Sequence, residues 1–530
     1  MDLRPKRELG VFPLVFIAVI SVIASGILVV PAVAASYAGP ASIFAVIIAG
    51  ISMLIFLLLY AEMSSEIPLS GGTVRYPDIS HGKIVSSMLG FGLLLAYIVS
   101  PPLVVEVMIS YLSPYIAGIY ANGTLTLAGI LISSFIFVVF YVPNLLGVKL
   151  TGLLSSIAGV IKVAIIAVFI AVILLFTMHF SNFTKYGIAP YGFSGVGLAV
   201  SAGGLFFAFT GFRLIIDYAG EARTPRESMP RSLLISLSIV FIIYLLMQIG
   251  FIGSINWSHL TVFGVTIGNW ASIGNLSAPL SQIAISNNLN WLSYLVTFFA
   301  IYSPLVFVIP VLGAEARLLY GLVNNGYLPK QLSALHKKFR TPHIALTVIL
   351  ILTIATLFLL PKYTSILSIV SSAYGFTYAT IGVQYIVIKR ILPEKRFRVP
   401  LGRVLAPISM ILGSFIVFWS FYPSTLYGFI IMAIVLPLYF YYNRNNRESI
   451  LSDLKTGWWF PVYAGLLVLF SYLGPTLFGG IGVIGTNMDY IALVIISLLF
   501  YYLGYRAGRK DIDISKLDLN LETSSIDTSN

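Results

Sequence analysis

The sequence predicts an all-α polytopic membrane protein with about 14 transmembrane helices. Three observations support this prediction: 58% of the 530 residues are hydrophobic, only 9% are charged, and the mean hydropathy is +0.96. Soluble domains carry about 25% charged residues, so this chain has too few charges to cover a soluble particle. A soluble enzyme and a disordered scaffold are therefore excluded. The chain also contains no cysteine, which excludes disulfides and Cys-ligated metals.

Long apolar stretches recur along the whole chain, and a transmembrane helix needs about 20 such residues. The first stretch follows a charged segment and is too long for a cleavable signal peptide, so we expect it to remain as a span. The last two stretches are short and form a weaker C-terminal pair after a core of twelve. The predicted spans are 11–37, 41–61, 84–112, 125–143, 152–178, 196–218, 232–253, 291–319, 344–360, 366–388, 404–421, 426–442, 458–473 and 490–505.

The basic residues test this topology. With the N-terminus in the cytoplasm, 28 of the 31 Lys and Arg residues fall in inner segments or at the inner ends of spans. The others are Lys185 and Lys362 in outer loops and Lys162 within span 5. Cytoplasmic loops of membrane proteins carry an excess of Lys and Arg. We therefore expect a multi-pass cell-membrane protein with both termini in the cytoplasm. The net charge of +12 reports orientation in the lipid bilayer and does not indicate nucleic-acid binding.

Spans 1 and 6 are both expected to be broken near their centres. Span 1 contains Ala-Ser-Gly-Ile at 24–27 and then Pro31. Span 6 contains Gly203 and Gly204, followed by the segment 206–211. Glycine weakens a helix, and proline removes a backbone hydrogen bond. In lipid, the freed backbone groups are tolerated only where they line a cavity, and paired interruptions of this kind indicate a transporter site.

The spacing of the two broken spans predicts an internal repeat. Spans 1 and 6 are five apart, an odd number, so the second set of five spans must be inverted relative to the first. The predicted organisation is a cytoplasmic segment at 1–10, repeat 1 at 11–178, repeat 2 at 196–388, spans 11 and 12 at 404–442, spans 13 and 14 at 458–505, and a polar cytoplasmic tail at 506–530.

The same residues resemble the amino acid–polyamine–organocation (APC) permeases. The segment 24–27 with Pro31 is similar to that superfamily's first-span signature, and the segments 206–212 and 221–225 are similar to its sixth-span signature. Arg213 departs from the pattern, because many members have a glutamate there. Further matches occur in the family's order at Pro68, Gly71, Gly72 and Tyr76 after span 2, at Arg317, Tyr320, Gly326, Pro329 and Pro342 after span 8, and at 397–400 before span 11.

The resemblance implies a five-plus-five, LeuT-like inverted-repeat fold in which an amino acid binds between spans 1 and 6. Free N–H groups at a broken helix suit a carboxylate, and unwound carbonyls suit an ammonium group. By this resemblance, Ser25, Gly26 and Ile27 bind the substrate carboxylate, and the carbonyls of Phe206, Ala208 and Phe209 bind its amine. The other residues that we expect in this substrate site are Ala24, Phe207 and Thr210.

Four other charged residues need a reason to lie in a membrane. Glu106 is deep in span 3, where a carboxylate is costly and often functional, so it is a candidate for binding a cationic substrate or a proton. Arg213 and Asp217 are four residues apart, on one helical face, and are a candidate inner-gate pair. Glu315, at the inner end of span 8 with Arg317, is assigned a structural or interfacial role.

Lys162 is the candidate for proton coupling. It lies near the middle of span 5, and the insertion of a lysine at a helix centre costs roughly 2.5–3.5 kcal/mol. Burial penalises the charged form of a lysine, so its protonation becomes sensitive to pH. In several APC members a lysine of span 5 occupies the place where sodium-coupled relatives bind a cation. The alternative is a lysine in a water-filled vestibule without a coupling role.

These features predict a secondary active amino-acid transporter that uses proton symport and alternating access, with no metal or cofactor. Exchange of cationic amino acids or polyamines is the alternative that Glu106 suggests. A proton-translocating subunit of a respiratory complex is a weaker alternative, because this chain has one buried lysine and no histidine at the centre of a span. No nucleophile or metal cluster suggests a membrane enzyme. The sequence leaves open which amino acid or amine is the substrate.

Overall fold

The computed structural model describes residues 5–121, 123–359, 363–391, 398–445 and 447–510. Most of these residues are helical, and the strands among them are β1 (Tyr120–Ala121) and β2 (Thr124–Leu125), which form one antiparallel hairpin. Lys362 and the predicted tail beyond residue 510 lie outside the described residues.

Within this described part, every predicted span overlaps helical structure. The helices of the first five spans are α1 (Val11–Val22) with α2 (Gly26–Ala38), α3 (Ser42–Glu66), α5 (Lys83–Leu112), α6 (Leu127–Leu146) and α7 (Val148–Phe176). Those of the next five are α8 (Gly192–Val200) with α9 (Leu205–Phe209) and α10 (Leu214–Asp217), α11 (Pro225–Gly253), α14 (Asn290–Asn324), α15 (His343–Leu359) and α16 (Tyr363–Ile391). The last four are α17 (Gly402–Phe418), α18 (Ser424–Ala433) with α19 (Leu436–Asn443), α21 (Trp459–Leu473) and α22 (Thr486–Ala507).

The helices confirm a polytopic membrane protein. Among the described residues, nine helical segments are long and apolar enough to cross a membrane, or ten if a bent pair counts as one span. The continuous stretch Gly26–Glu66 enters this count once, although it contains both α2 and α3, and the apolar helices α1, α15 and α17 are shorter than the criterion requires. The count of fourteen spans therefore stays a prediction.

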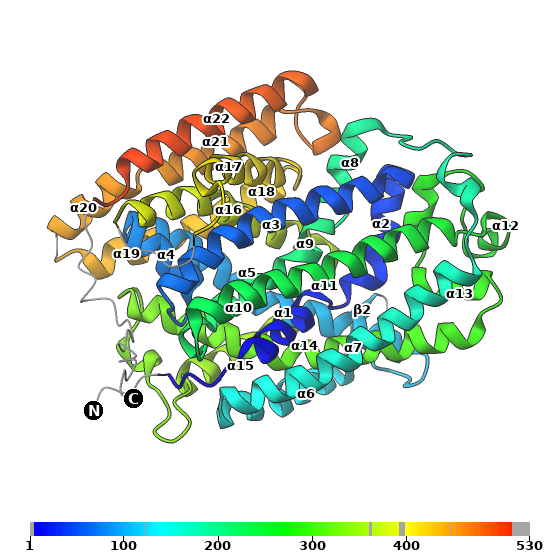
Figure 1. Cartoon of the computed structure of the whole chain (residues 1–530), viewed down its shortest axis with the longest axis horizontal. Helices are drawn as coiled ribbons and strands as arrows, with labels where there is room; N and C mark the ends of the chain where they lie inside the picture. Colours follow the sequence, from blue (N-terminus) through cyan, green and yellow to red (C-terminus); the bar gives the residue numbers. More distant parts are fainter. Residues whose placement is uncertain (1–4, 122, 360–362, 392–397, 446, 511–530) are drawn as a thin grey trace, which may run out of the picture.

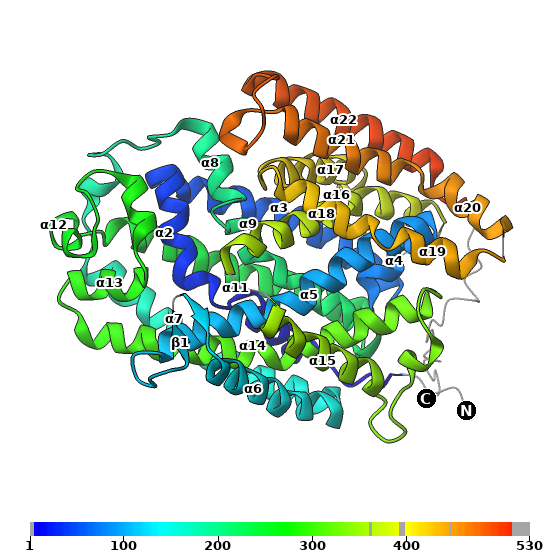
Figure 2. The same cartoon turned by 180° about the vertical axis from the view of Figure 1, so that it is seen from behind.

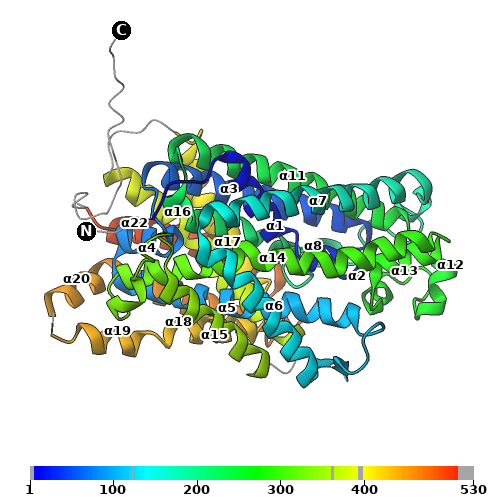
Figure 3. The ribbon, with the colours of Figure 1, turned by 90° about the horizontal axis from the view of Figure 1, so that it is seen from below.

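The spans run along the long axis of the molecule, and their connections gather at its two ends. The short helices α12 (Trp257–Leu260) and α13 (Pro279–Ser286) lie at one end, and α4 (Gly72–His81), α19 and α20 (Arg447–Gly457) lie at the other (Figures 1 and 2). This separation agrees with the predicted alternation of outer and inner loops. Helices α6 and α15 pack together at one side of the bundle (Figure 3).

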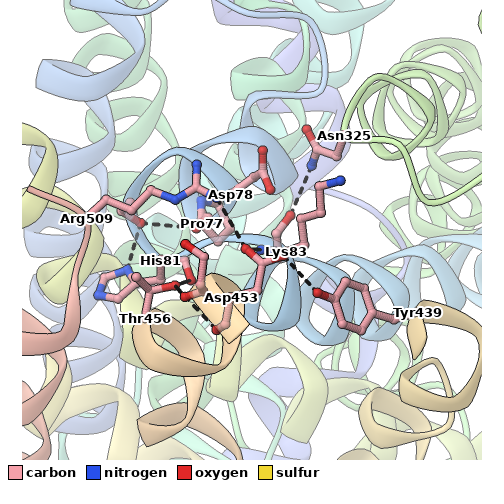
Figure 4. Close-up of polar contacts among 12 residues, drawn as sticks. Pro77, Asp78, His81, Lys83, Asn325, Tyr439, Asp453, Thr456 and Arg509 are labelled. Carbon is pink, nitrogen blue, oxygen red and sulfur yellow. Dashed lines mark hydrogen bonds and ion pairs between the residues drawn. The ribbon is translucent and has the colours of Figure 1, made fainter. Parts of the chain in front are cut away.

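The polar stretch 449–455 is helical and belongs to α20. Its Asp453 is buried and joins several elements (Figure 4). One carboxylate oxygen accepts hydrogen bonds from the Lys83 backbone N–H at 3.1 Å and from Arg509 Nη2 at 3.4 Å. The other accepts a hydrogen bond from the Tyr439 hydroxyl at 2.8 Å. The C-terminal helices are thereby fastened to the start of α5.

His81, the last residue of α4, extends this polar cluster to α22. Its ring is buried, and Nε2 lies 3.1 Å from the carbonyl oxygen of Gly504. A carbonyl only accepts hydrogen bonds, so Nε2 carries the proton. The Thr456 hydroxyl donates to the backbone carbonyl of His81 at 2.8 Å. Burial lowers the pKa of His81 to about 3, and the charges of Arg390 and Arg509 act in the same direction.

This lowered pKa predicts a pH-dependent stability. The folded protein holds His81 neutral, so its stabilisation is complete above the ordinary pKa of 6.5 and is lost as the pH falls from 6.5 toward 3. The parent should lose about 1.4 kcal/mol more unfolding free energy per pH unit in this range than His81→Gln does. Thermal unfolding of the purified protein between pH 7 and pH 5 measures the difference. His179→Gln, at an exposed position, should keep the parent's pH slope; equal slopes in the parent and His81→Gln would contradict the prediction.

Candidate functional site

The breaks of spans 1 and 6 lie side by side in the centre of the bundle. Helix α1 ends at Val22 and α2 begins at Gly26, while α8 ends at Val200 and α9 begins after Gly204. The Tyr244 hydroxyl of α11 bonds to both broken spans, at 2.9 Å from the Val22 carbonyl and 3.2 Å from the Ala208 carbonyl. One side chain therefore satisfies carbonyls from both interruptions.

Glycine permits the close approach of the two breaks. A Cβ atom added at Gly211 would lie 2.3 Å from the carbonyl oxygen of Ser21, so any other residue would force the two backbones apart. Gly204 has a φ of 79°, a left-handed conformation that glycine adopts without strain. The local sequence thus explains both the position of the breaks and their contact.

A cavity of about 50 Å³ lies between the breaks and is completed by side chains of α5, α14 and α16. It has room for a few water molecules, so the site must widen to accept a larger molecule. Of the predicted substrate residues, Ala24, Ser25, Gly26, Phe207, Ala208 and Thr210 line it, and Ile27, Phe206 and Phe209 are buried just outside the lining. The other residues that line it are Ser21, Val22, Tyr97, Ser100, Val104, Gly211, Arg213, Leu214, Phe307, Val311 and Tyr374.

The two broken spans carry backbone groups of opposite polarity at residues that line this cavity. Gly26 is the first residue of α2, and the first N–H groups of an α-helix have no acceptor within the helix. These N–H groups form the positive end of the helix dipole. Across the cavity, the Ala208 carbonyl already accepts a hydrogen bond from Tyr244 and has a second lone pair. A carboxylate at one end and an ammonium group at the other would suit this polarity.

Lys162 of α7 is hydrogen-bonded to the break of span 1 and to α14. Its side chain is fully buried, and Nζ donates hydrogen bonds to the carbonyl oxygens of Ile20 at 3.2 Å, Ile23 at 2.7 Å and Ser303 at 3.0 Å. The first two acceptors belong to the end of α1 and its break, and the third belongs to α14. Three acceptors match the three hydrogens of an ammonium group. Lys162 therefore links α7 both to the break in span 1 and to α14.

Arg213 and Asp217 are both buried, but among the described residues no direct ion pair joins them. Asp217 accepts hydrogen bonds from the backbone N–H of Thr73 at 3.2 Å, from its hydroxyl at 2.6 Å, and from the Tyr97 hydroxyl at 3.2 Å. Arg213 Nε donates to that same Tyr97 oxygen at 3.1 Å. A tyrosine thus lies between the two residues, and their role as an inner gate stays a prediction.

A buried ion pair closes the connection after span 6. Arg317 donates two hydrogen bonds to the carboxylate of Glu221, at 2.7 and 2.9 Å, and its guanidinium carbon lies 4.1 Å from the Tyr218 ring centroid. Beside it, Leu9 pairs with Ala222 in a parallel β-bridge. Sequence analysis placed Arg317 and Glu221 in matched motifs but did not pair them, because 96 residues separate the two.

Two carboxylates lie away from the expected site. Glu106 is half-buried and lines a separate pocket of about 240 Å³ with Thr124 and Thr356, and this pocket shares no lining residue with the central cavity. Glu315 of α14 is fully buried, and neither of its oxygens has a hydrogen-bond partner among the described residues. The sequence signal that could have marked Glu315 as a candidate functional residue was a carboxylate within a membrane span, which is costly and often functional. Among the described residues, no group of three or more His, Asp or Glu side chains is placed to hold a metal ion.

Comparison with known proteins gives a consistent set of relatives. Residues 9–436 match the family described as amino acid permease. The glutamate/serine transporter AimA of Bacillus subtilis (strain 168) is 31% identical over 520 residues, covering 95% of this chain and 94% of the relative. The aspartate-proton symporter of the same organism is 29% identical over 506 residues, covering 94% and 96% of the two chains. The branched-chain amino acid permease BcaP of the same organism is 24% identical over 460 residues, covering 84% of this chain and 94% of the relative.

Proposed function

This chain belongs to the amino acid permease family, and from that premise we propose that it is a proton-coupled amino-acid symporter that works by alternating access. The family match confirms the resemblance to the APC permeases, and the relatives named above are a transporter, a symporter and a permease. One observation carries the proposal: the cavity is lined by residues from the breaks of both span 1 and span 6, including Gly26 at the N-terminus of α2 and Ala208 of α9.

The substrate backbone binds across this space. The carboxylate is placed at the N-terminus of α2, on the N–H groups of Ser25, Gly26 and Ile27, where the helix dipole favours a negative charge. The ammonium group is placed at the carbonyls of the α9 segment, which includes Phe206, Ala208 and Phe209. Main-chain recognition of this kind suits any amino acid, so the side chain of the substrate must be selected elsewhere in the cavity.

The fold supports two inverted repeats within fourteen spans. Residues 11–178 and 196–388 each begin with a broken span followed by four further helices, and two pairs of helices follow at 404–442 and 458–505. Placing α4 and α20 in the cytoplasm, together with both chain ends, agrees with the distribution of Lys and Arg. Alternating access would arise as one helical group moves relative to the other around the central cavity.

Lys162 supplies the coupling in this proposal. When protonated, it links α7 to the break of span 1 and to α14 through three carbonyls. A neutral amine has one donor hydrogen fewer, so loss of the proton weakens these links and frees α7 to move relative to α1. One relative, the aspartate-proton symporter, couples transport to protons, which supports the proposal.

Uptake by purified protein in proteoliposomes tests the function. With an inward proton gradient and no sodium, we expect at least one of the twenty amino acids to accumulate, and an ionophore that dissipates the gradient should abolish the accumulation. Empty liposomes are the control. No uptake of any amino acid would overturn the function, and an absolute requirement for sodium would overturn the coupling.

The alternative of cationic amino acid or polyamine exchange depended on Glu106. Because Glu106 lies in a pocket separate from the central cavity, the geometry gives this alternative no support. The respiratory-subunit alternative likewise gains nothing from the comparisons, whose relatives transport amino acids or methylthioribose.

A further inference from the structure

Arg213 is a buried arginine in the central cavity, and no carboxylate bonded to it explains why its charge lies there. It is 1% exposed, and among the described residues that line the central cavity it is the one charged residue. Its guanidinium carbon lies 4.0 Å from the ring centroid of Tyr374, 5.1 Å from that of Tyr97 and 5.3 Å from that of Tyr378. The three aromatic rings position the guanidinium group and support its charge, but they contribute no anion.

The hydrogen bonds of Arg213 are also incomplete. Nε donates to the Tyr97 hydroxyl, but Nη1 is buried and has no acceptor among the described residues. Asp217, the nearest carboxylate along the chain, has its oxygens occupied by Thr73 and Tyr97. A buried cation without a directly bonded anion is costly, and an unpaired guanidinium N–H adds to that cost. A ligand that brings its own carboxylate into the cavity would remove both costs.

We propose that Arg213 binds the side-chain carboxylate of the substrate and so selects acidic amino acids. This inference rests on the proposed function, since it assumes that the α-carboxylate and α-ammonium groups occupy the two helix breaks. The side-chain carboxylate of an acidic substrate can then pair with Arg213, the one charged residue among the described residues that line the cavity. A guanidinium group binds a carboxylate through two parallel N–H bonds. The same charge repels the side chain of a cationic amino acid.

Matched pairs of substrates test this selection in the parent protein. Glutamate and glutamine have nearly the same shape, as do aspartate and asparagine, and the members of each pair differ in the side-chain charge. The parent in proteoliposomes should take up at least one acid with a kcat/KM at least about 30-fold above that of its amide, because truncating one partner of a buried charge pair costs a comparable factor. The acid should also raise the melting temperature of the purified parent more than the amide does.

Two variants of Arg213 then identify the residue responsible. Arg213→Gln should lose the preference for the acid, so that its kcat/KM for the acid falls toward its kcat/KM for the amide. Arg213→Lys keeps the charge but not the planar pair of donors, so it should retain a reduced preference. Arg231→Gln is the matched control, because it removes an exposed arginine from an i,i+4 pair with Glu227, and it should behave like the parent.

The possible results separate the two proposals. A parent that transports amino acids without preferring an acid over its amide overturns the role of Arg213 and leaves the transport function in place. An acid preference that survives in Arg213→Gln also overturns it. If Arg213→Gln does not fold, the test uses Arg213→Lys and the melting temperature of the parent. The proposal is then overturned if Arg213→Lys prefers the acid as strongly as the parent does and if acid and amide raise the melting temperature of the parent equally. A parent that transports no amino acid overturns the proposed function itself.

Discussion

Lys162→Met is expected to abolish the accumulation of amino acid driven by a pH gradient, and Lys162→Ala is expected to do the same. Lys162 Nζ donates to three carbonyls of α1 and α14, and neither replacement has a donor. Methionine is similar to lysine in length, so the fold should persist while the protonatable link between the helices is lost. Uptake into proteoliposomes, with and without an inward proton gradient, measures this effect.

The design separates coupling from general damage. Lys149→Met makes the same replacement at an exposed position of the same helix and should accumulate substrate like the parent. Exchange of substrate without a gradient should persist in Lys162→Met, because the substrate-binding helix breaks remain. Undiminished gradient-driven uptake in both Lys162 variants would reject the mechanism. Glu315→Gln is an informative third variant, since loss of coupling there alone would transfer the role to Glu315.

Gly26→Leu is expected to abolish substrate binding and uptake. Gly26 is the first residue of α2 and lines a cavity of about 50 Å³, so a leucine side chain would occupy the space where the main chain meets the ligand. The protein should still fold, because helix α2 tolerates leucine well. Substrate-induced shifts of the melting temperature report binding, and proteoliposome uptake reports transport.

Gly26→Ala provides the control for steric strain. A Cβ atom at this position would lie 3.8 Å from Val30 Cγ2 and 4.0 Å from Ala208 Cβ, which are ordinary contact distances. The alanine variant should therefore fold and retain binding, although with some loss of affinity. If Gly26→Leu binds and transports like the parent, the break in span 1 is not part of the substrate site.

The sequence predicted the features that local chemistry controls. Hydropathy located the membrane-spanning helices, because lipid requires each backbone polar group to be bonded within its own helix. Glycine located the breaks of spans 1 and 6 for the same reason, since it weakens the helix and leaves backbone groups that need a cavity. Pro31, which was expected to add to the break of span 1, lies instead within α2. The matched motifs identified the family, which the comparisons confirm. The cost of burying a charge singled out Lys162 before its three acceptors were visible.

Only the tertiary structure decided which side chains meet. It joined Arg213 to Asp217 through Tyr97, paired Glu221 with Arg317, and moved Glu106 away from the central cavity. It also showed that α20 and α22, which lie beyond the residues that match the family, are hydrogen-bonded to α4 and α5. Contacts between helices depend on how each helix is rotated and packed against its neighbours. Hydropathy and helix-breaking residues act over a few turns, so they determine where a helix lies in the sequence and leave its partners undetermined.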